Sequence, residues 1–452
     1  MRRGRWIALL SVVAVAAAYL SVAGGAGAQE DETPEATEIG VTADTITITV
    51  IADVDNAARP GLFKGSRDGV IAAAEYINEE EGGLAGRELE VNFIDSRLSG
   101  DEARSALIQA CQDSFAVVGT TALFLNNVDP AVNCVDQAGA ATGLPDVPVL
   151  QTETVHQCSV VSFPVIAGQM QCENGAPIEN ANGEETYLTR QGHVKYHLKK
   201  NDGELSGVWV IPGDLPSTIR ATVPLVDGGI KAGIEEVDRF EASALGGQSE
   251  FTAPIQAVKS NSATYVLNGL DYRGTVQMRK EATIQGVTGV QVFDCTVQCY
   301  DQRFIEEGGA DVEGQFVSTF FIPFEEAKQN NSVKQFLKFV GKDNADGFGA
   351  QAWAAGLFFR DVVSNIVEAD GVNGLTRAAF LEEAANVHDF TADVDGEGLL
   401  APTDVGGRVP NSCFVMMQVK DGKFKRVFPK EKGTHSCNDK KNLVTVKIDQ
   451  VQ

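Results

Sequence analysis

The sequence predicts an α/β protein built from two doubly wound, Rossmann-like lobes, and three observations lead to this fold class. Near the start of the chain, segments with strand-like and helix-like apolar spacing alternate. A second series of the same alternation follows a segment rich in Gly, Asn and Pro. At 452 residues, the chain is also long enough for two or three domains. Alternating strands and helices indicate parallel sheets with helices on both faces.

The first series spans residues 45–123. Residues 45–51 are a run of β-branched side chains that alternates apolar and polar positions, as a strand does. Residues 66–80 have helical apolar spacing, and Gly82 and Gly83 end that helix. The unit is completed by a strand at 88–94, a helix at 101–112 and a strand at 115–119. In such βαβαβ units, ligands bind beyond the carboxyl ends of the strands.

The rest of the chain continues this pattern. We expect a helix at 128–139, a strand at 147–151 and a disulfide-tied surface excursion at 163–189. The second series begins with a helix at 190–200 and the strand 207–211. A strand at 315–319 is expected to return the chain to the first lobe.

The first 28 residues have the features of a secretory signal peptide. Residues 1–5 are basic, residues 6–22 are apolar, and Ala26-Gly27-Ala28 is a small-residue cleavage pattern. An uncleaved membrane anchor is the alternative, because the apolar run approaches spanning length. Cleavage predicts an exported protein of the periplasm, the cell envelope or the extracellular space. Residues 29–43 are acidic and are expected to form a disordered leader.

Eight cysteines in an exported protein favour disulfides over metal or redox chemistry. Eight cysteines allow 105 connectivities, so the predicted pairs rest on proximity in the sequence alone. These pairs are Cys111 with Cys134, Cys158 with Cys172, Cys295 with Cys299, and Cys413 with Cys437. For the short Cys295–Cys299 spacing, free thiols and a metal site are alternatives, but two further metal ligands are missing nearby.

The charge and the motifs exclude several functions. A formal charge of -25 argues against binding to nucleic acid or to an anionic membrane. The sequence contains no P-loop, no G-x-S-x-G motif and no G-x-G-x-x-G after the first strand. His193 and His197 have the spacing of a zinc-binding pair, but no third ligand is near in sequence, which favours a surface helix pair. We therefore predict no enzyme activity, no cofactor and no metal.

Several segments, in order, resemble the type I periplasmic binding proteins, specifically the solute-binding subunits of branched-chain amino-acid ABC transporters. Residues 65–78 and then Gly82-Gly83-Leu84-Ala85-Gly86-Arg87 resemble the first helix of that family and its "GGINGR" turn. Ala116-Val117-Val118-Gly119 is similar to its "aiiGp" strand. The other similar segments are Phe293-Asp294, Phe304-Ile305, Gly314 and the hairpin after Cys413. The resemblance covers residues 44–430.

The resemblance implies a hinged clamshell whose two lobes are joined by three crossings. The expected boundaries are 44–165 for the first part of lobe 1, 166–315 for the first part of lobe 2, 316–395 for the return to lobe 1, and 396–447 for the closing strands of lobe 2. It implies a monomer that captures a small molecule between the lobes and delivers it to an ABC permease. A sensory module that acts through a receptor is the alternative function, and an extracellular hydrolase would require a clustered catalytic set.

By position, the ligand-contacting turns of the family fall on ten residues. They are Thr120, Thr121, Ala122, Thr152, Glu153 and Thr154 in lobe 1, and Asn268, Tyr272, Asp294 and Thr296 in lobe 2. Leu123, Phe124 and Leu125 stand where the family has a serine cluster. The resemblance implies a ligand that is amino-acid-like, a small amide or an organic acid. The departure at residues 123–125, and Glu153 in the small-residue turn, favour a more apolar ligand or one that is not an amino acid.

Each of these residues has a structural alternative. Asp294 is expected to pair with a ligand ammonium or to cap a helix. Tyr272 is expected to form an apolar wall of the site or to pack at the rim between the lobes. Thr120 and Thr121 are expected to hold an anionic group or to cap the following helix. Glu153 is expected to attract an amine or to lie exposed in a loop.

Overall fold

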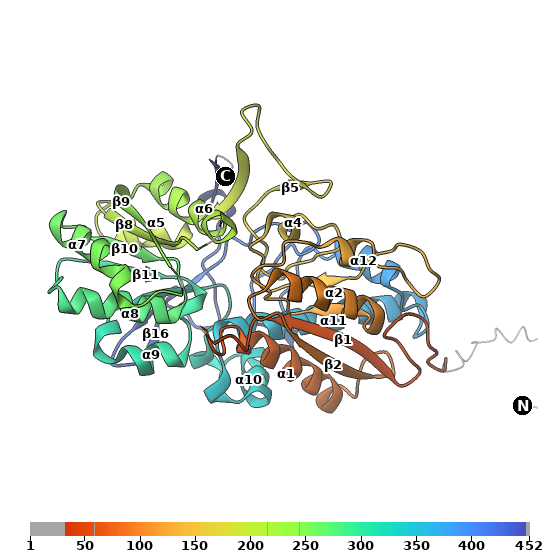
Figure 1. Cartoon of the computed structure of the whole chain (residues 1–452). Coiled ribbons are helices and arrows are strands. Elements are labelled where there is room, and N and C mark those ends of the chain that lie inside the picture. The colour runs from red at the N-terminus through yellow and green to blue at the C-terminus, as the bar shows by residue number, and fades with distance from the viewer. Residues whose placement is uncertain (1–31, 58, 215, 244, 449–452) are drawn as a thin grey trace, which may run out of the picture. The chain divides into compact units, whose positions relative to one another are not determined.

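The computed structural model describes residues 32–57, 59–214, 216–243 and 245–448 (Figure 1). The predicted signal peptide, residues 1–28, lies outside the described residues, as do residues 29–31 of the expected leader. Within the described ranges, no helix has both the length and the apolar character needed to cross a membrane.

The first sheet has four parallel strands in the order β2-β1-β3-β4. The strands are β1 (Thr45–Ala52), β2 (Glu88–Asp95), β3 (Ala116–Val118) and β4 (Asp146–Val147). Its two faces bury different side chains, because successive residues of a strand point to opposite sides. Ile48 and Val50 pack in the cluster of helices α1 (Lys64–Glu80) and α11 (Gly347–Asp370), whereas Ile51 packs with α2 (Gly100–Asp113).

Helices α1 and α11 approach closely because glycine stands at their contact. A Cβ atom on Gly69 would lie 2.2 Å from the carbonyl oxygen of Gly349, so a larger residue at position 69 would force the helices apart. Trp353, in the same helix as Gly349, is fully buried in this core. The helix that follows β1 is thereby fixed against the centre of the first sheet.

The second sheet has seven strands in the order β16-β15-β12-β11-β10-β8-β9. They are β8 (Ser206–Pro212), β9 (Glu235–Ala242), β10 (Tyr265–Asn268), β11 (Val292–Cys295), β12 (Phe316–Thr319), β15 (Val415–Val419) and β16 (Phe424–Phe428). The strands from β8 to β12 are parallel, and β15 and β16 are antiparallel. Trp209 and Tyr265 are buried on one face with α5 (Gly192–Lys200) and α6 (Pro216–Ala232). Val208 and Val266 are buried on the other with α7 (Thr252–Ser260) and α8 (Tyr272–Ile284).

Both sheets therefore carry helices on both faces, which confirms the predicted fold class. Figure 1 shows the red and orange elements of the first sheet and the green elements of the second as separate groups. The remaining elements are α3 (Asp129–Val132), α4 (Thr154–Gln157), β5 (Cys172–Glu173), β6 (Ala176–Pro177), β7 (Glu185–Arg190), η1 (Gln248–Phe251), η2 (Val297–Cys299), α9 (Gln302–Gly308), η3 (Gly309–Val312), η4 (Phe324–Glu326), α10 (Asn331–Val340), η5 (Lys342–Asn344), α12 (Arg377–Ala385), β13 (Asp393–Val394), β14 (Glu397–Gly398), α13 (Asp439–Asn442) and β17 (Leu443–Ile448).

Three local expectations differ from the structure. The strand expected to return the chain to the first lobe, β12, lies in the second sheet between β11 and β15, because a short crossover through α9 and η3 places it beside β11. The helix expected at 128–139 is limited to the four residues of α3, after which the chain turns and Cys134 bonds to Cys111. Strand β4 ends at Val147, since Pro148 has no backbone N–H to donate to a sheet.

The expected disordered leader is also corrected where the structure describes it. Val41 is 2% exposed and packs in the core of the first sheet. Glu38 is 4% exposed, and its carboxylate accepts hydrogen bonds from the backbone N–H groups of Gln137 and Arg377. Residues 33–43 are therefore held by a buried apolar side chain and a satisfied carboxylate, which the acidic composition did not predict.

All eight cysteines form disulfides, and the pairs predicted from proximity are confirmed. They are Cys111–Cys134, Cys158–Cys172, Cys295–Cys299 and Cys413–Cys437. The short pair is possible because η2 turns the chain directly after β11. This turn brings the two Cα atoms within 6.1 Å, inside the usual range for a disulfide.

Candidate functional site

A cavity of about 460 Å³ lies where strands of both sheets end. Loops that follow β1, β3 and β4 of the first sheet line it, as do loops that follow β8, β10 and β11 of the second. Ligands of open α/β sheets bind beyond the carboxyl ends of the strands, so this is the place that the fold predicts for a site. The volume is in the range of pockets that bind small molecules, and exceeds by about threefold a ~150 Å³ cavity that holds benzene.

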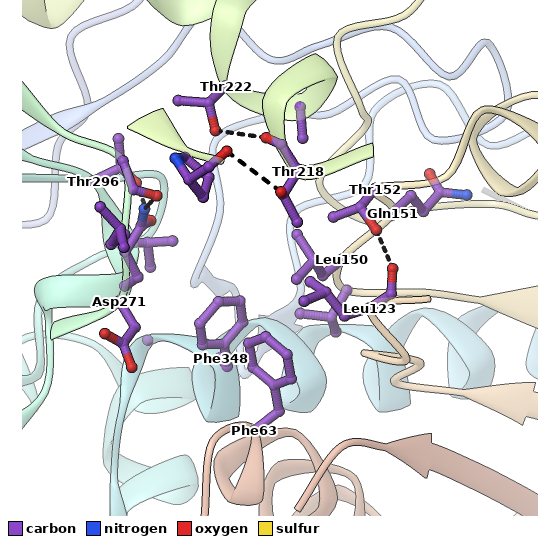
Figure 2. Close-up of a pocket in the computed structure, with 18 of the residues that line it drawn as sticks. Phe63, Leu123, Leu150, Gln151, Thr152, Thr218, Thr222, Asp271, Thr296 and Phe348 are labelled. Carbon is purple, nitrogen blue, oxygen red and sulfur yellow. Dashed lines mark hydrogen bonds between the residues drawn. The ribbon is translucent and has the colours of Figure 1, made fainter. Parts of the chain in front are cut away.

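Part of the lining is an apolar wall made of Phe63, Leu123, Leu150 and Phe348. The rings of Phe63 and Phe348 contact edge to face, with centroids 4.9 Å apart. Figure 2 shows these two rings below Leu123 and Leu150, with Thr218 and Thr222 above them and Thr296 to the left. A ligand in this cavity can therefore bury an apolar body.

The hydroxyl groups of the cavity threonines donate their hydrogen bonds to acceptors of the protein. Thr152 donates to the carbonyl of Leu123, and Thr296 donates to the side-chain oxygen of Gln298. Thr218 donates to the carbonyl of Pro212 at 3.4 Å, and Thr222 donates to that of Thr218 at 3.0 Å (Figure 2). Because a hydroxyl has one proton, these groups remain available mainly as acceptors.

Gln151 supplies another acceptor. Its amide nitrogen donates to the carbonyl of His156 at 2.7 Å and to the hydroxyl of Ser162 at 3.0 Å. Its side-chain oxygen is buried and has no hydrogen-bond partner among the described residues. A buried acceptor of this kind favours a ligand or a water that carries a donor.

Four arginines line the cavity, and three of them have acidic partners. The partners are Asp271 for Arg59 at 3.5 Å, Glu185 for Arg220 at 3.4 Å, and Asp301 for Arg303 at 2.6 Å. The fourth is Arg190, whose Nε donates to the carbonyl of Asn411 at 3.0 Å and whose Nη2 donates to that of Ala167 at 3.2 Å. Its guanidinium also lies 4.6 Å from the ring centroid of Phe320.

The ten residues predicted by resemblance divide into two groups. Thr152, Tyr272 and Thr296 line the cavity. The other seven do not line it: Thr120, Thr121, Ala122, Asn268 and Asp294 are buried in the sheets at 0–1% exposure, and Glu153 and Thr154 lie at the start of α4. Thr120 donates to Asp146 at 2.8 Å rather than capping a helix, and Thr154 accepts from Arg220 at 2.9 Å.

The placement of Asp294 is a correction with a physical cause. Its Oδ2 accepts from the Tyr265 hydroxyl at 2.8 Å and lies 3.5 Å from Nε2 of His197 and 3.9 Å from Nε2 of His193. Burial raises the pKa of Asp294, but His197, His193 and the Tyr265 hydroxyl together hold it below its ordinary value. The carboxylate thus has its partners in β10 and α5; of these, His193 lines the cavity, whereas Asp294 itself does not.

The same cluster corrects the expectation of a surface histidine pair. His193 is 5% exposed and His197 is 1% exposed, so both rings are buried. Among the described residues, no group of three His, Cys, Asp or Glu side chains has the arrangement of a metal site. The two rings therefore serve as partners of Asp294.

Sequence reasoning missed most of the cavity. The loop after β1 supplies Arg59, Leu62 and Phe63, and its position at the carboxyl end of the first strand was a sufficient reason to include it. For Arg190 and Phe348, no local pattern indicates a binding role, since β7 and α11 reach the cavity only through the tertiary fold.

Comparison with solved structures identifies this architecture. A leucine-binding protein of Thermotoga maritima superposes with a TM-score of 0.61 at 17% identity, over 84% of this chain and 97% of that one. A branched-chain amino-acid ABC transporter protein of Thermus thermophilus, solved with bound valine, gives 0.63 at 11% identity, over 85% and 95%. A fatty-acid ABC transporter substrate-binding protein of Thermomonospora curvata gives 0.61 at 13% identity, over 86% and 92%. The chain has the type I periplasmic binding protein fold.

A sequence comparison supports the same assignment. Residues 221–423 match the family model described as periplasmic binding protein. This segment contains most of the second sheet and all of α11, so the matched part of the chain includes both Tyr272 and Phe348 of the cavity. Among curated proteins, none matches the chain by sequence.

Proposed function

We propose that this periplasmic binding protein captures a small molecule in the cavity and delivers it to an ABC importer in the membrane. The observation that carries the proposal is the cavity of about 460 Å³, lined by strand-end loops of both sheets. Leucine, valine and fatty acid are named for the similar structures. For this chain, we propose an amino-acid-like molecule, a small amide or an organic acid.

The mechanism is closure of two lobes around the ligand. We assign residues 44–165 and 316–395 mainly to one lobe and residues 166–315 and 396–447 mainly to the other, with β12 added to the second. A ligand that contacts Leu123 or Leu150 on one side and Tyr272 or Thr296 on the other stabilises the closed form. It therefore shifts an existing equilibrium by its differential affinity for the two states.

The proposal includes binding without catalysis. The cavity threonines donate to protein acceptors, and Asp271 and Asp301 are paired with arginines. A nucleophile requires an adjacent base that removes its proton. The proposal also includes export and a monomeric protein.

A thermal-shift screen tests the proposal. Purified protein is screened against amino acids, amides, short acids and aromatic acids, since a ligand of the native state raises the melting temperature by mass action. At 100 times the dissociation constant, we expect a stabilisation of about 2.7 kcal/mol. Small-angle X-ray scattering should show a smaller radius of gyration with the ligand, because the lobes close.

A pair of matched variants makes the screen specific. Leu150→Arg places a charge in the apolar wall and should abolish the shift. Ile284→Arg makes the same change at a side chain that is 70% exposed, and should leave the shift intact. Equal shifts in both variants would place the binding site elsewhere, and the lack of any small-molecule ligand would contradict capture.

A further inference from the structure

The cavity contains one charge that the protein does not balance. Arg59, Arg220 and Arg303 each have a carboxylate within 3.5 Å. No described residue places a carboxylate within ion-pair distance of Arg190, and the two bonds that its guanidinium makes are both to backbone carbonyls. Four arginines with the same chemistry thus line one cavity, and Arg190 differs from the rest in lacking an anion.

The surroundings of Arg190 make this lack costly. Burial lowers the pKa of the guanidinium to about 10, so the group is charged at neutral pH while it is partly removed from water. Phe320 covers one of its faces, with 4.6 Å between the guanidinium carbon and the ring centroid. His193 also lines the cavity, but burial lowers its pKa below the usual range, so it is neutral at pH 7 and adds no second positive charge beside Arg190.

A desolvated cation is stabilised by an anion with matching geometry. The planar guanidinium donates two parallel hydrogen bonds to a carboxylate, which makes arginine the residue best suited to bind this group. The threonine hydroxyls and the Gln151 amide donate to protein acceptors, so they do not compete for a ligand oxygen. Arg190 therefore offers an anion a guanidinium whose charge no described carboxylate balances; Nη2 of Arg59 lacks a hydrogen-bond partner among the described residues, but the charge of Arg59 is paired with Asp271.

The acids of the cavity are engaged, which argues against a ligand ammonium. Asp301 binds Arg303, and Asp271 binds Arg59 and caps α8 through the N–H of Gly274 at 2.9 Å. Asp346 caps α11 through the N–H of Gly349 at 2.7 Å and lies 3.5 Å from Arg303. Asp214 is exposed and accepts from the hydroxyl of Ser243 at 2.6 Å. An α-amino acid would therefore find no unengaged carboxylate among the described residues of the cavity, and its ammonium would have only neutral acceptors such as the Gln151 oxygen and the threonine hydroxyls.

From this arrangement we infer the class of ligand: an amphipathic monocarboxylate without an amino group. Its carboxylate binds the guanidinium of Arg190, and its apolar body packs on Phe63, Leu123, Leu150 and Phe348. The inference rests on the proposed function, because it names which of the small molecules the cavity holds. It also gives Arg190 a role in specificity that is separate from lobe closure.

The test compares four probes by isothermal titration calorimetry at pH 7: octanoate, octanamide, octylamine and leucine. The first three have the same apolar chain and differ in the head group. We expect octanoate to bind 10- to 100-fold more tightly than octanamide, since hydrogen bonds between two charged groups are roughly twice as strong as those to a neutral group. Octylamine and leucine should bind more weakly than octanamide.

Variants identify the residue responsible. Arg190→Gln should reduce the ratio of octanoate to octanamide affinity to within about threefold while octanamide binding remains, because the apolar wall is intact. Arg190→Lys should restore part of the ratio, since it keeps the charge without the planar fork. Arg104→Gln, at an exposed arginine of α2, removes the same charge away from the cavity and should leave the ratio unchanged.

Each outcome decides between the two proposals. An unchanged ratio in Arg190→Gln, or tighter binding of the amide, the amine or leucine in the native protein, overturns the monocarboxylate inference and leaves solute capture standing. The same holds if none of the four probes binds while another small molecule stabilises the protein in the screen. If no small molecule of any class binds, both the inference and the proposed function fail.

Discussion

The Nε atom of Arg59 lies 3.5 Å from the Oδ2 atom of Asp271, which joins the loop after β1 to the N-cap of α8. The side chains are 9% and 17% exposed, so the pair is largely removed from water. The same loop accepts hydrogen bonds at its Pro60 and Gly61 carbonyls from Arg273 and Arg303, both at 3.4 Å. Elements that carry the two sheets are thus held together beside the cavity by charged groups.

The first prediction is that loss of this pair opens the lobes. Arg59→Gln should increase the radius of gyration of the ligand-free protein in X-ray scattering, and should weaken ligand binding because closure becomes less favourable. With Asp271→Asn in a double-mutant cycle, we expect a coupling free energy of about 1–2 kcal/mol for binding. Arg104→Gln is the control for the lost charge. Additive effects of the two changes would show that the pair makes no contribution to closure.

The second prediction concerns Asp346, which caps α11. Burial, with a further contribution from Asp301, raises the pKa of Asp346 to about 7. Because the folded-state pKa exceeds the ordinary value of 3.8, the folded protein binds the proton more tightly than the unfolded chain. The stability associated with this proton is complete below about pH 4 and is lost as the pH rises through about 7.

Asp346→Asn removes this titration and keeps a side chain that caps helices. The variant should match the native protein in melting temperature at pH 4. At pH 8 it should be more stable by about 2–4 kcal/mol, because it no longer buries a charge. Melting curves from pH 4 to pH 9 measure this difference, in which the titration of all other groups cancels. A difference that does not change with pH would contradict a raised pKa for Asp346.

Much of the fold could be predicted because the information is local. Residues 45–51 alternate between apolar and polar side chains, and Val70, Ile77 and their neighbours have helical spacing. These patterns indicate which side chains β1 and α1 bury. The errors arise where contacts with segments distant in the sequence determine the structure. Whether β12 joins the first or the second sheet depends on which strand edge is free, and the buried state of Glu38 depends on Gln137 and Arg377.

The cavity lies at the edge of the sheets where the sequence predicts a site, but most of its lining follows the predicted residues in the chain. Asn268 and Asp294 belong to β10 and β11 and are still covered by neighbouring elements. Tyr272 and Thr296 follow the strands and line the cavity. In the first sheet Thr120 is buried against Asp146, and the lining begins at Leu123. The sequence shows where a strand pattern ends, but not how many of the following residues are buried by neighbouring strands and helices.

The third prediction separates Asp294 from binding. Asp294→Asn removes the charge that faces His197 and Tyr265, and the replacement leaves a buried hydroxyl and two imidazoles with altered partners. We expect a loss of about 2–4 kcal/mol in the free energy of unfolding. Ligand affinity should stay within about twofold of the native value, since the residue does not line the cavity. A large loss of affinity at unchanged stability would instead make Asp294 a ligand contact.

The last prediction concerns Arg377, a fully buried side chain that donates hydrogen bonds at the C-terminal end of α2. Its guanidinium donates to the carbonyls of Cys111 and Ser114 at 2.9 Å and 2.5 Å, and to those of Phe115 and Val135 at 3.2 Å and 2.8 Å. The last carbonyls of a helix have no partner within the helix, so this side chain supplies donors that no backbone group provides there.

Arg377→Met fills a similar volume and removes the guanidinium donors from these carbonyls, of which those of Ser114 and Phe115 are buried. Each unsatisfied group costs about 1 kcal/mol or more, so we expect a loss of about 3–5 kcal/mol in the free energy of unfolding. Urea unfolding at pH 7 measures it, and Arg104→Met at an exposed site of α2 should stay within about 0.5 kcal/mol of the native protein. A loss below about 1 kcal/mol would mean that water or a backbone shift satisfies the carbonyls once the guanidinium is gone.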